Sequence, residues 1–429
     1  MLEDPKQPGA VLLGARTMQE GGAFLNMTRE DVELFCIDHQ VMVEITATDE
    51  ALIFDFASST AIPSPTHHTE TSIQPSPSVT GIEGVMQVAH IILTDFEYEE
   101  DAFIRAKQSL HEQFDSTVRR LESACMEKLV NSMTNNDKRY VCYIHESIDA
   151  LDLTTCKRAI RAQLSPANVE VSMAGDLPLE SMEELVLTYL GTVPSVTELD
   201  QADSATSTSS SPSSSNAPSL PSQSPRHLEV FLPDSEERAM GYLSGPAPNR
   251  WGVFADGQSI VDKVAHYTGN KEVGRWKNPL FGYASLQILQ EVANRRLFSV
   301  VREERQLTYD ASFQLSPWDH LQGAWYTVSV TSSPAQVQAA LQACREALTS
   351  LKGSHGIMGD SIQSAKRILS NKLHADLFTT KAWVEKLSGI QSIVSIPGRD
   401  LNSIVDYESI LQSITLQDIQ LLIELFHFE

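Results

Sequence analysis

The stretch from residue 300 to residue 310, "VVREERQLTYD", places an arginine and a tyrosine where both could hold one substrate group. Arg302 precedes Tyr309 by seven residues, and the pattern around them predicts a helix end followed by a strand. A guanidinium and a phenol both keep their protons at neutral pH, so both can donate to a developing oxyanion. A second interpretation stays open, in which the cation complements a helix dipole and the tyrosine packs in the core. Arg305 and Glu303 are expected to be solvated.

The histidines form no recognisable metal-binding motif. None of the 12 histidines belongs to an H-x-x-E-H or an H-E-x-x-H sequence, the two spacings that place paired imidazoles on zinc. "HEQFD" at 111–115 and "HESID" at 145–149 begin like the second motif but lack its closing histidine, so both are interpreted as polar helix surface or turn. His67 and His68 lie in a stretch rich in proline, serine and threonine, which favours solvated loop residues over metal ligands. The chain alone is therefore predicted to bind no metal.

Length, charge and cysteine content limit the class of protein. With 429 residues, 41% of them hydrophobic, the chain can form two or three domains with their own cores. Its net charge of −24 argues against general nucleic-acid binding and leaves either attraction of basic partners or plain solubility. The five cysteines form no C-x-x-C pair and their number is odd, which indicates free thiols in a reducing compartment.

No apolar run approaches the roughly 18 residues of a membrane span. The first residues resemble neither a signal nor a transit peptide, and they lead into an apolar segment as though further sequence preceded them.

Two stretches of low complexity divide the chain. Residues 60–80 are predicted to be a disordered insertion in a first unit that covers residues 1–196. Residues 197–226, rich in serine and proline, are predicted to be a linker. A second unit covers residues 227–429 and stops where the first unit continues, so we expect it to be truncated at its C-terminal end.

The hydrophobic pattern predicts a similar order of strands and helices before and after the linker. Before it, we expect strands at 40–49, 51–58 and from 168, and helices at 81–95, 98–132 and 153–164. After it, we expect strands at 307–315 and 323–332, and helices at 281–304, 334–352, 359–376, 380–394 and 415–427. The phrase "ESI" recurs at 146–148 and 408–410, which indicates an internal repeat. The predicted fold class is α+β, with two homologous units that each have an antiparallel sheet covered by helices.

Six stretches of the chain, taken in order, are similar to the C-terminal half of the pitrilysin or insulinase family of zinc metallopeptidases. They are "ARTMQEGG", "VELFC", "AGDLPLESMEELVLTYLGTVP", "GPAPNRWG", "NRRLFSVVREERQLTYDASF" and "GAWYTVSVTSSP". Within the family, the chain most resembles the plant and algal stromal processing type. The resemblance covers nearly the whole chain apart from the two low-complexity stretches.

The resemblance implies one half of a clamshell of four α+β units. In this family the N-terminal half carries zinc on H-x-x-E-H, which is absent here, so we expect a zinc-bearing half upstream or in a partner chain. This chain alone is then not expected to hydrolyse peptides. The resemblance also implies that Arg302 and Tyr309 project towards that zinc and hold and polarise the substrate carbonyl.

The implied substrate is an extended, basic peptide such as an organellar targeting peptide, and the implied location is the chloroplast stroma. The strand at 51–58 could pair with such a peptide. Trp251 and Trp325 could line a peptide-binding wall or anchor the core. A non-catalytic structural or binding subunit of the same fold remains the alternative function, and an unrelated α+β protein is a more distant one.

Overall fold

The computed structural model describes most of the chain outside the two low-complexity stretches. The described residues are 6–24, 27–48, 50–58, 81–134, 145–164, 169–176, 178–194, 227–232, 237–254, 258–269, 273–316, 324–353, 356–391 and 400–428. The predicted insertion at 60–80, with His67 and His68, and the predicted linker at 197–226 lie outside these residues. Two compact units form, one from Met1–Asp115 with Tyr143–Ser210 and the other from Ser116–Cys142 with Ser211–Glu429.

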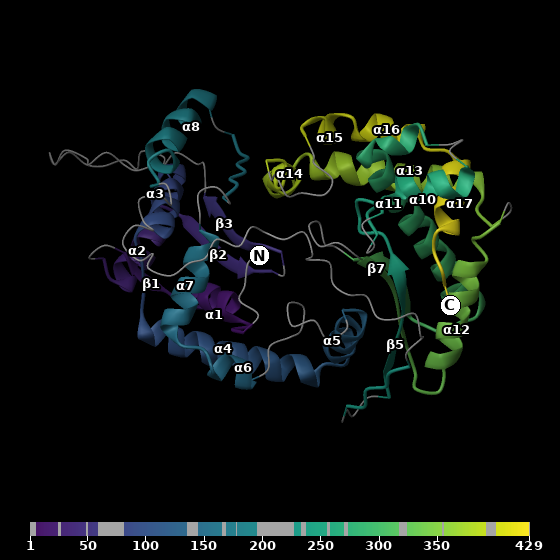
Figure 1. The fold of residues 1–429 in the computed structure, drawn as a ribbon, viewed down its shortest axis with the longest axis horizontal. Helices are drawn as coiled ribbons and strands as arrows, with labels where there is room; N and C mark the ends of the chain where they lie inside the picture. The colour runs from purple at the N-terminus through teal and green to yellow at the C-terminus, as the bar shows by residue number, and fades with distance from the viewer. Residues whose placement is uncertain are drawn as a thin grey trace, which may run out of the picture. The chain divides into compact units, whose positions relative to one another are not determined.

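The first unit combines helices with two small antiparallel sheets (Figure 1). Its helices are α1 (Ala10–Gln19), α2 (Arg29–Asp38), α3 (Gly81–Thr94), α4 (Glu100–Arg119, which runs on into the second unit), α6 (His145–Asp149), α7 (Leu153–Gln163), α8 (Leu179–Leu185) and the π-helical η2 (Val186–Leu190). Its strands are β1 (Gly22–Phe24), β2 (Val41–Ala47), β3 (Leu52–Ser58) and β4 (Phe96–Tyr98). β1 pairs with β4, and β2 pairs with β3.

Alternating side chains place one face of the β2–β3 pair against the helices. Val43 lies opposite Phe56 in the register, while Met42 and Asp55 are exposed on the other face. The buried face packs on α1, α3 and α7 through residues that include Val11, Ala15, Val85 and Ile160. α2 begins at a capping box in which Thr28 and Asp31 satisfy each other's backbone N–H groups, as their spacing suggests.

The second unit holds the larger core. Its helices are α5 (Leu121–Met133), α10 (Ile260–Thr268), the 3₁₀-helical η3 (Arg275–Lys277), α11 (Pro279–Leu297), the π-helical η4 (Phe298–Glu304), α12 (Val337–Thr349), α13 (Gly359–Asp376), α14 (Thr380–Leu387), α15 (Asn402–Val405), α16 (Tyr407–Ser413) and α17 (Leu416–Glu424). Its strands β5 (Ala239–Ala247), β6 (Asp310–Leu315) and β7 (Ala324–Ser332) form one antiparallel sheet in the order β5-β7-β6.

The sheet and helices of the second unit share one hydrophobic core. Val328 and Val330 on the central strand β7 are fully buried, and α11 and α12 pack beside the sheet (Figure 1). Residues after α17 complete this core, because the rings of Phe426 and Phe428 pack around Tyr326. The Tyr326 hydroxyl donates to the carbonyl of His427 at 2.8 Å. The α+β class with antiparallel sheets is therefore confirmed.

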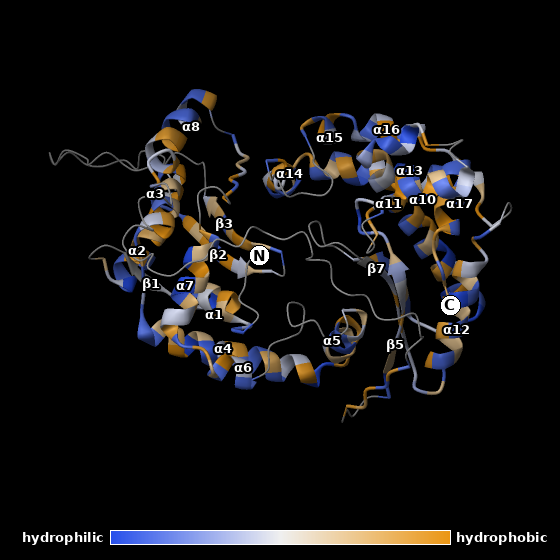
Figure 2. Ribbon diagram, in the orientation of Figure 1, coloured by the Kyte–Doolittle hydropathy of each residue, from blue (hydrophilic) through white to orange (hydrophobic). Residues whose placement is uncertain are grey.

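Several of the predicted elements differ from the observed ones, among them the helix expected at 380–394, which ends at Leu387. The single helix expected at 98–132 is interrupted at Arg120, whose extended backbone (φ −93°, ψ 128°) separates α4 from α5. Figure 2 shows apolar and polar segments alternating along α4, so the amphipathic pattern was correct but could not reveal the break. Residues 169–176, expected to include a strand, form none in the described chain. The helix expected at 281–304 is α-helical only to Leu297 and continues as η4.

Candidate substrate-holding site

The candidate site begins at the end of α11, which the core holds along most of its length. Eleven of its residues are buried, among them Leu286, Ile288 and Leu289. The helix then widens into η4, where the N–H of Arg305 donates to the carbonyl of Val300 at 3.2 Å, a π-helical bond. Val301 is fully buried while Arg302 is exposed. A fixed helix end therefore presents Arg302 to solvent.

Arg302 lies against an aromatic ring of its own helix. Its guanidinium carbon is 4.9 Å from the ring centroid of Phe298, four residues earlier, which is the geometry of a cation–π contact. Within the described part of the chain, Arg302 forms no hydrogen bond or ion pair. Its five N–H groups therefore stay free to donate to a ligand.

Arg305, in the same stretch, has a different role. Its guanidinium pairs with the carboxylate of Glu346 on α12 at 2.7 Å. The pKa of Glu346 is lowered by the hydrogen bonds that its carboxylate accepts, most by the one from Gln342 and next by the one from Arg305. Arg305 is partly exposed, as expected, but it is tied to the scaffold, whereas Arg302 is not.

A tightly held turn leads from η4 to the start of β6. Gln306 adopts the left-handed region (φ 53°). The hydroxyl of Ser332, at the end of β7, donates to the carbonyl of Leu307 at 2.5 Å. Thr308 is buried, and its hydroxyl accepts from the N–H of Asp310 at 3.1 Å. These contacts fix the backbone on both sides of Tyr309.

Tyr309 departs from the alternation expected for a strand. The predicted strand at 307–315 would place Tyr309 on the same side as Phe313, yet β6 begins only at Asp310. Phe313 is fully buried, whereas the Tyr309 side chain is 85% exposed. The alternative of a core tyrosine is therefore wrong, and the phenol faces solvent.

Asn294 locks the helix and the strand of the site together. Its side-chain amide donates to the carbonyl of Phe313 at 3.2 Å and accepts from the N–H of Phe313 at 2.6 Å. The paired bonds connect α11, which leads into the η4 segment of Arg302, with β6, which begins directly after Tyr309. Among the described contacts, none joins the Arg302 and Tyr309 side chains, so each side chain is positioned by its own segment of backbone.

The chemistry available to these two side chains is hydrogen-bond donation. A guanidinium and a neutral phenol can bind a carbonyl oxygen or an oxyanion. Among the described residues, no group of three or more histidines, cysteines, aspartates and glutamates is arranged to hold a metal ion. The described part of the chain therefore offers no zinc site to pair with these donors.

The two tryptophans considered as a peptide-binding wall lie in the core. Trp251 is 9% exposed and stacks on Tyr283, with ring centroids 4.3 Å apart, and Trp325 is 4% exposed in β7.

The sequence analysis did not name Phe298 as a partner of Arg302, although its position four residues earlier on a helix was a usable signal. No described helix is both long enough and apolar enough to cross a membrane.

Comparison with known proteins gives the family. Residues 151–369, slightly more than half of the chain, match the family described as "Peptidase M16 inactive domain". The chloroplastic stromal processing peptidase of Arabidopsis thaliana is 33% identical over 437 residues, covering 98% of this chain but 32% of that protein. The chain thus spans about a third of the length of the curated relatives it matches.

Solved structures share the fold at low sequence identity. The periplasmic protease PqqL from Escherichia coli superposes with a TM-score of 0.68 at 11% identity, covering 98% of this chain and 40% of that one. The peptidase M16 inactive domain from Pseudomonas fluorescens gives a TM-score of 0.67 at 13% identity, covering 99% and 87%. The family match over more than half of the chain, on this α+β architecture, shows that the chain belongs to the peptidase M16 family, in the group described as its inactive domain.

Proposed function

We propose that this chain is the C-terminal, substrate-clamping half of a zinc metalloendopeptidase that processes or degrades peptides. The observation that carries the proposal is the exposed pair Arg302 and Tyr309 on a helix end and strand start that the core holds in place. The metal-bearing half lies outside this chain, either upstream or in a partner. No described residues of this chain fit a zinc site, so we assign the chain no step through zinc.

Arg302 and Tyr309 act by donating hydrogen bonds to the carbonyl oxygen of the peptide bond to be cleaved. That oxygen gains negative charge as the carbonyl carbon is attacked, so donors already in position stabilise the transition state more than the ground state. The Phe298 ring and the turn around Thr308 hold the donors, and Arg305 is kept on Glu346. Little reorganisation is then needed when the charge develops.

The proposed substrate is an extended, basic peptide, such as a targeting peptide in the chloroplast stroma. Glu303 and Asp310 are exposed and directly follow the two donors along the chain, and the whole chain carries a net charge of −24. Acidic groups beside the site favour Arg-rich peptides over acidic ones. The relatives' name, stromal processing peptidase, supports both the substrate class and the location.

The family description also supports the alternative function, a non-catalytic structural or binding subunit. The family description is that of an inactive domain, and the Pseudomonas fluorescens protein is such a domain with 87% of its chain covered. A non-catalytic structural or binding subunit of the same fold would need neither donor.

The test is peptide cleavage by this chain combined with the zinc-bearing half from the same source. We expect Arg302→Ala and Tyr309→Phe each to lower kcat/KM on the order of 100-fold, since each removes one oxyanion donor. Arg305→Ala, which removes a neighbouring arginine already paired with Glu346, is the matched control and should change kcat/KM far less.

Two outcomes would count against the proposal in different ways. Equal kinetics for Arg302→Ala, Tyr309→Phe and the unmodified chain would remove the role of the two donors. Association with the zinc-bearing half without any dependence of cleavage on this chain would favour the structural subunit instead.

A further inference from the structure

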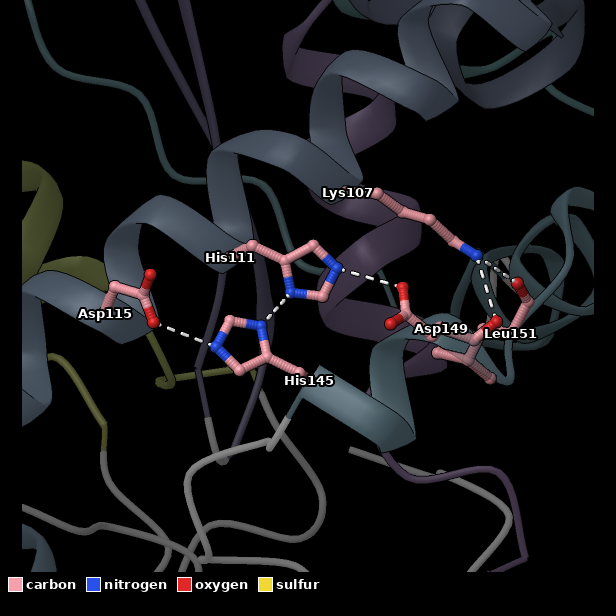
Figure 3. A network of polar contacts seen from close by, with 6 residues as sticks. All are labelled: Lys107, His111, Asp115, His145, Asp149 and Leu151. Carbon is pink, nitrogen blue, oxygen red and sulfur yellow. Dashed lines mark hydrogen bonds and ion pairs between the residues drawn. The ribbon is translucent and has the colours of Figure 1, made fainter.

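Two short sequences with the same spacing meet in the first unit. His111 and Asp115 lie four residues apart on α4, and His145 and Asp149 lie four residues apart on α6. We interpreted these sequences, "HEQFD" and "HESID", as separate stretches of polar surface. Figure 3 shows that the four side chains instead form one continuous chain of polar contacts between the two helices.

The contacts are reciprocal. Nε2 of His111 on α4 lies 3.0 Å from the Asp149 carboxylate of α6, and Nε2 of His145 on α6 lies 2.9 Å from the Asp115 carboxylate of α4. The two remaining ring nitrogens, Nδ1 of His111 and Nδ1 of His145, contact each other. The ring planes are 25° apart with centroids separated by 4.5 Å, and Figure 3 shows the two Nδ1 atoms turned towards each other, as an N–H···N hydrogen bond requires.

The number of protons in this chain of contacts follows from its geometry. A carboxylate only accepts, so each Nε2 must carry a hydrogen. The contact between the two Nδ1 atoms needs one hydrogen and not two. The four ring nitrogens therefore share three hydrogens, which makes one imidazole neutral and the other an imidazolium. With a fourth hydrogen, the two Nδ1–H groups would point at each other. With only two hydrogens, one of the three hydrogen bonds would be lost.

A metal ion is a poorer occupant of the space between the rings than a proton. Zinc sites in proteins use three or four protein ligands, and here only two nitrogens face each other. Both carboxylates contact the far nitrogens of the rings, and no three potential ligands converge within the described residues. We infer that His111, His145, Asp115 and Asp149 form a proton-binding clasp that fastens α6 to α4.

The surroundings of the clasp fit this role. Lys107, four residues before His111 on α4, donates to the carbonyls of Asp149 and Leu151 at 3.3 and 2.8 Å and so caps the end of α6. The ring of Phe114 lies edge-on to His145 at 4.9 Å. Ile148 on the inner side of α6 is buried in the core with Leu110. Within the described chain, the carboxylates of Asp115 on α4 and Asp149 on α6 contact the two imidazoles.

Solvent can supply and remove the shared proton. The side chains of His111 and His145 are 25% and 38% exposed.

Hydrogen exchange in the peptide 145–151 of the full chain tests the clasp. The N–H groups of Ala150 and Leu151 are protected there by bonds to Glu146 and Ile148. His111→Gln leaves the sequence of this peptide unchanged, so the ratio of exchange rates between variant and unmodified chain at one pH reports only the opening of α6. We expect a ratio of roughly fivefold at neutral pH, because the variant loses the contacts of the His111 ring to Asp149 and His145.

Two further variants and one metal addition sharpen the test. His374→Gln, at an exposed histidine of α13 in the other unit, should leave the ratio at one throughout. Asp115→Asn keeps an acceptor but removes its charge, and it should give a smaller ratio than His111→Gln. A ratio of one for His111→Gln would overturn the clasp. Slower exchange on adding Zn²⁺ in the unmodified chain but not in His111→Gln would overturn it in favour of a metal site.

Discussion

Phe298 is the residue on which the placement of Arg302 depends most directly. The ring lies under the guanidinium and belongs to the same π-helical segment, so helix and ring together restrict the arginine to few rotamers. A cation–π contact at a partly exposed site contributes about 0.5–1 kcal/mol. It orients a donor and does not itself touch the substrate, so we regard Phe298 as a positioning residue.

We therefore expect Phe298→Leu to lower kcat/KM about two- to fivefold in the assembled peptidase, mainly through kcat. Leucine keeps the apolar contact but lacks the ring face that attracts the cation. Phe378→Leu, at a 92% exposed phenylalanine outside the site, is the control and should have no effect. An effect of Phe298→Leu as large as that of Arg302→Ala would mean that Phe298 does more than orient the arginine.

The resemblance and the seven-residue spacing together singled out Arg302 and Tyr309, but they did not predict what surrounds them. The exposure of Tyr309 depends on where β6 begins, and the bonds of Ser332 to Leu307 and of Thr308 to Asp310 set that point. The pairing of Arg305 with Glu346 joins segments that are distant in sequence. Such contacts leave no periodic signal, so a single sequence cannot reveal them.

At the scale of single elements, the start of α17 brings together buried charged side chains. Thr415 and Asp418 form a capping box, and Asp418, 2% exposed, also accepts from Arg275 at 2.9 Å. Nearby, the buried Lys366 donates to the carbonyl of Gln412 at 2.7 Å, and burial lowers its pKa. The start of α17 is thus fastened by polar contacts, while its inner face contributes Leu422 and Ile423 to the core.

Asp418→Ala should lower the free energy of unfolding of the second unit by about 2 kcal/mol, because it removes a helix cap and a charge-assisted hydrogen bond together. Asp262→Ala removes the corresponding residue of the exposed capping box of α10 and should cost less. All five tryptophans of the chain lie in the second unit, so urea unfolding followed by tryptophan fluorescence reports that unit alone. Equal losses for the two variants would show that burial and Arg275 add nothing to the cap.

Helices and strands with a clear period were predictable, and their interruptions were not. The expected helix at 359–376 coincides with α13, and the alternating pattern located β2, β3 and β7. The break at Arg120 and the π-helical turn of η4 are changes of backbone path that an amphipathic pattern tolerates. The meeting of α4 and α6 was equally hidden, since two matching four-residue spacings do not show that they face each other.

At the scale of the whole chain, the residues form two compact units. One boundary between the units falls between Ser210 and Ser211, within the serine- and proline-rich stretch, and two others fall after Asp115 and after Cys142. That stretch has almost no apolar side chains, so it has little to bury. We propose that residues 197–226 are a linker between the units.

Deleting residues 203–224 should then leave the melting temperature of both units unchanged. Circular dichroism follows the whole chain and tryptophan fluorescence follows the second unit, so the two signals together distinguish the units. A large drop in either melting temperature would show that the deleted residues contribute to a core.

The packing of Phe426 and Phe428 around Tyr326 has a consequence for synthesis of the protein. The ribosome makes the sheet and α11 long before it makes these two rings, and the core beneath Tyr326 stays open until they emerge. The first unit can fold during translation, because the residues of its core all precede the low-complexity stretch. The second unit must wait, so a nascent chain stalled before residue 426 would expose Tyr326 and Phe313 to chaperones and proteases.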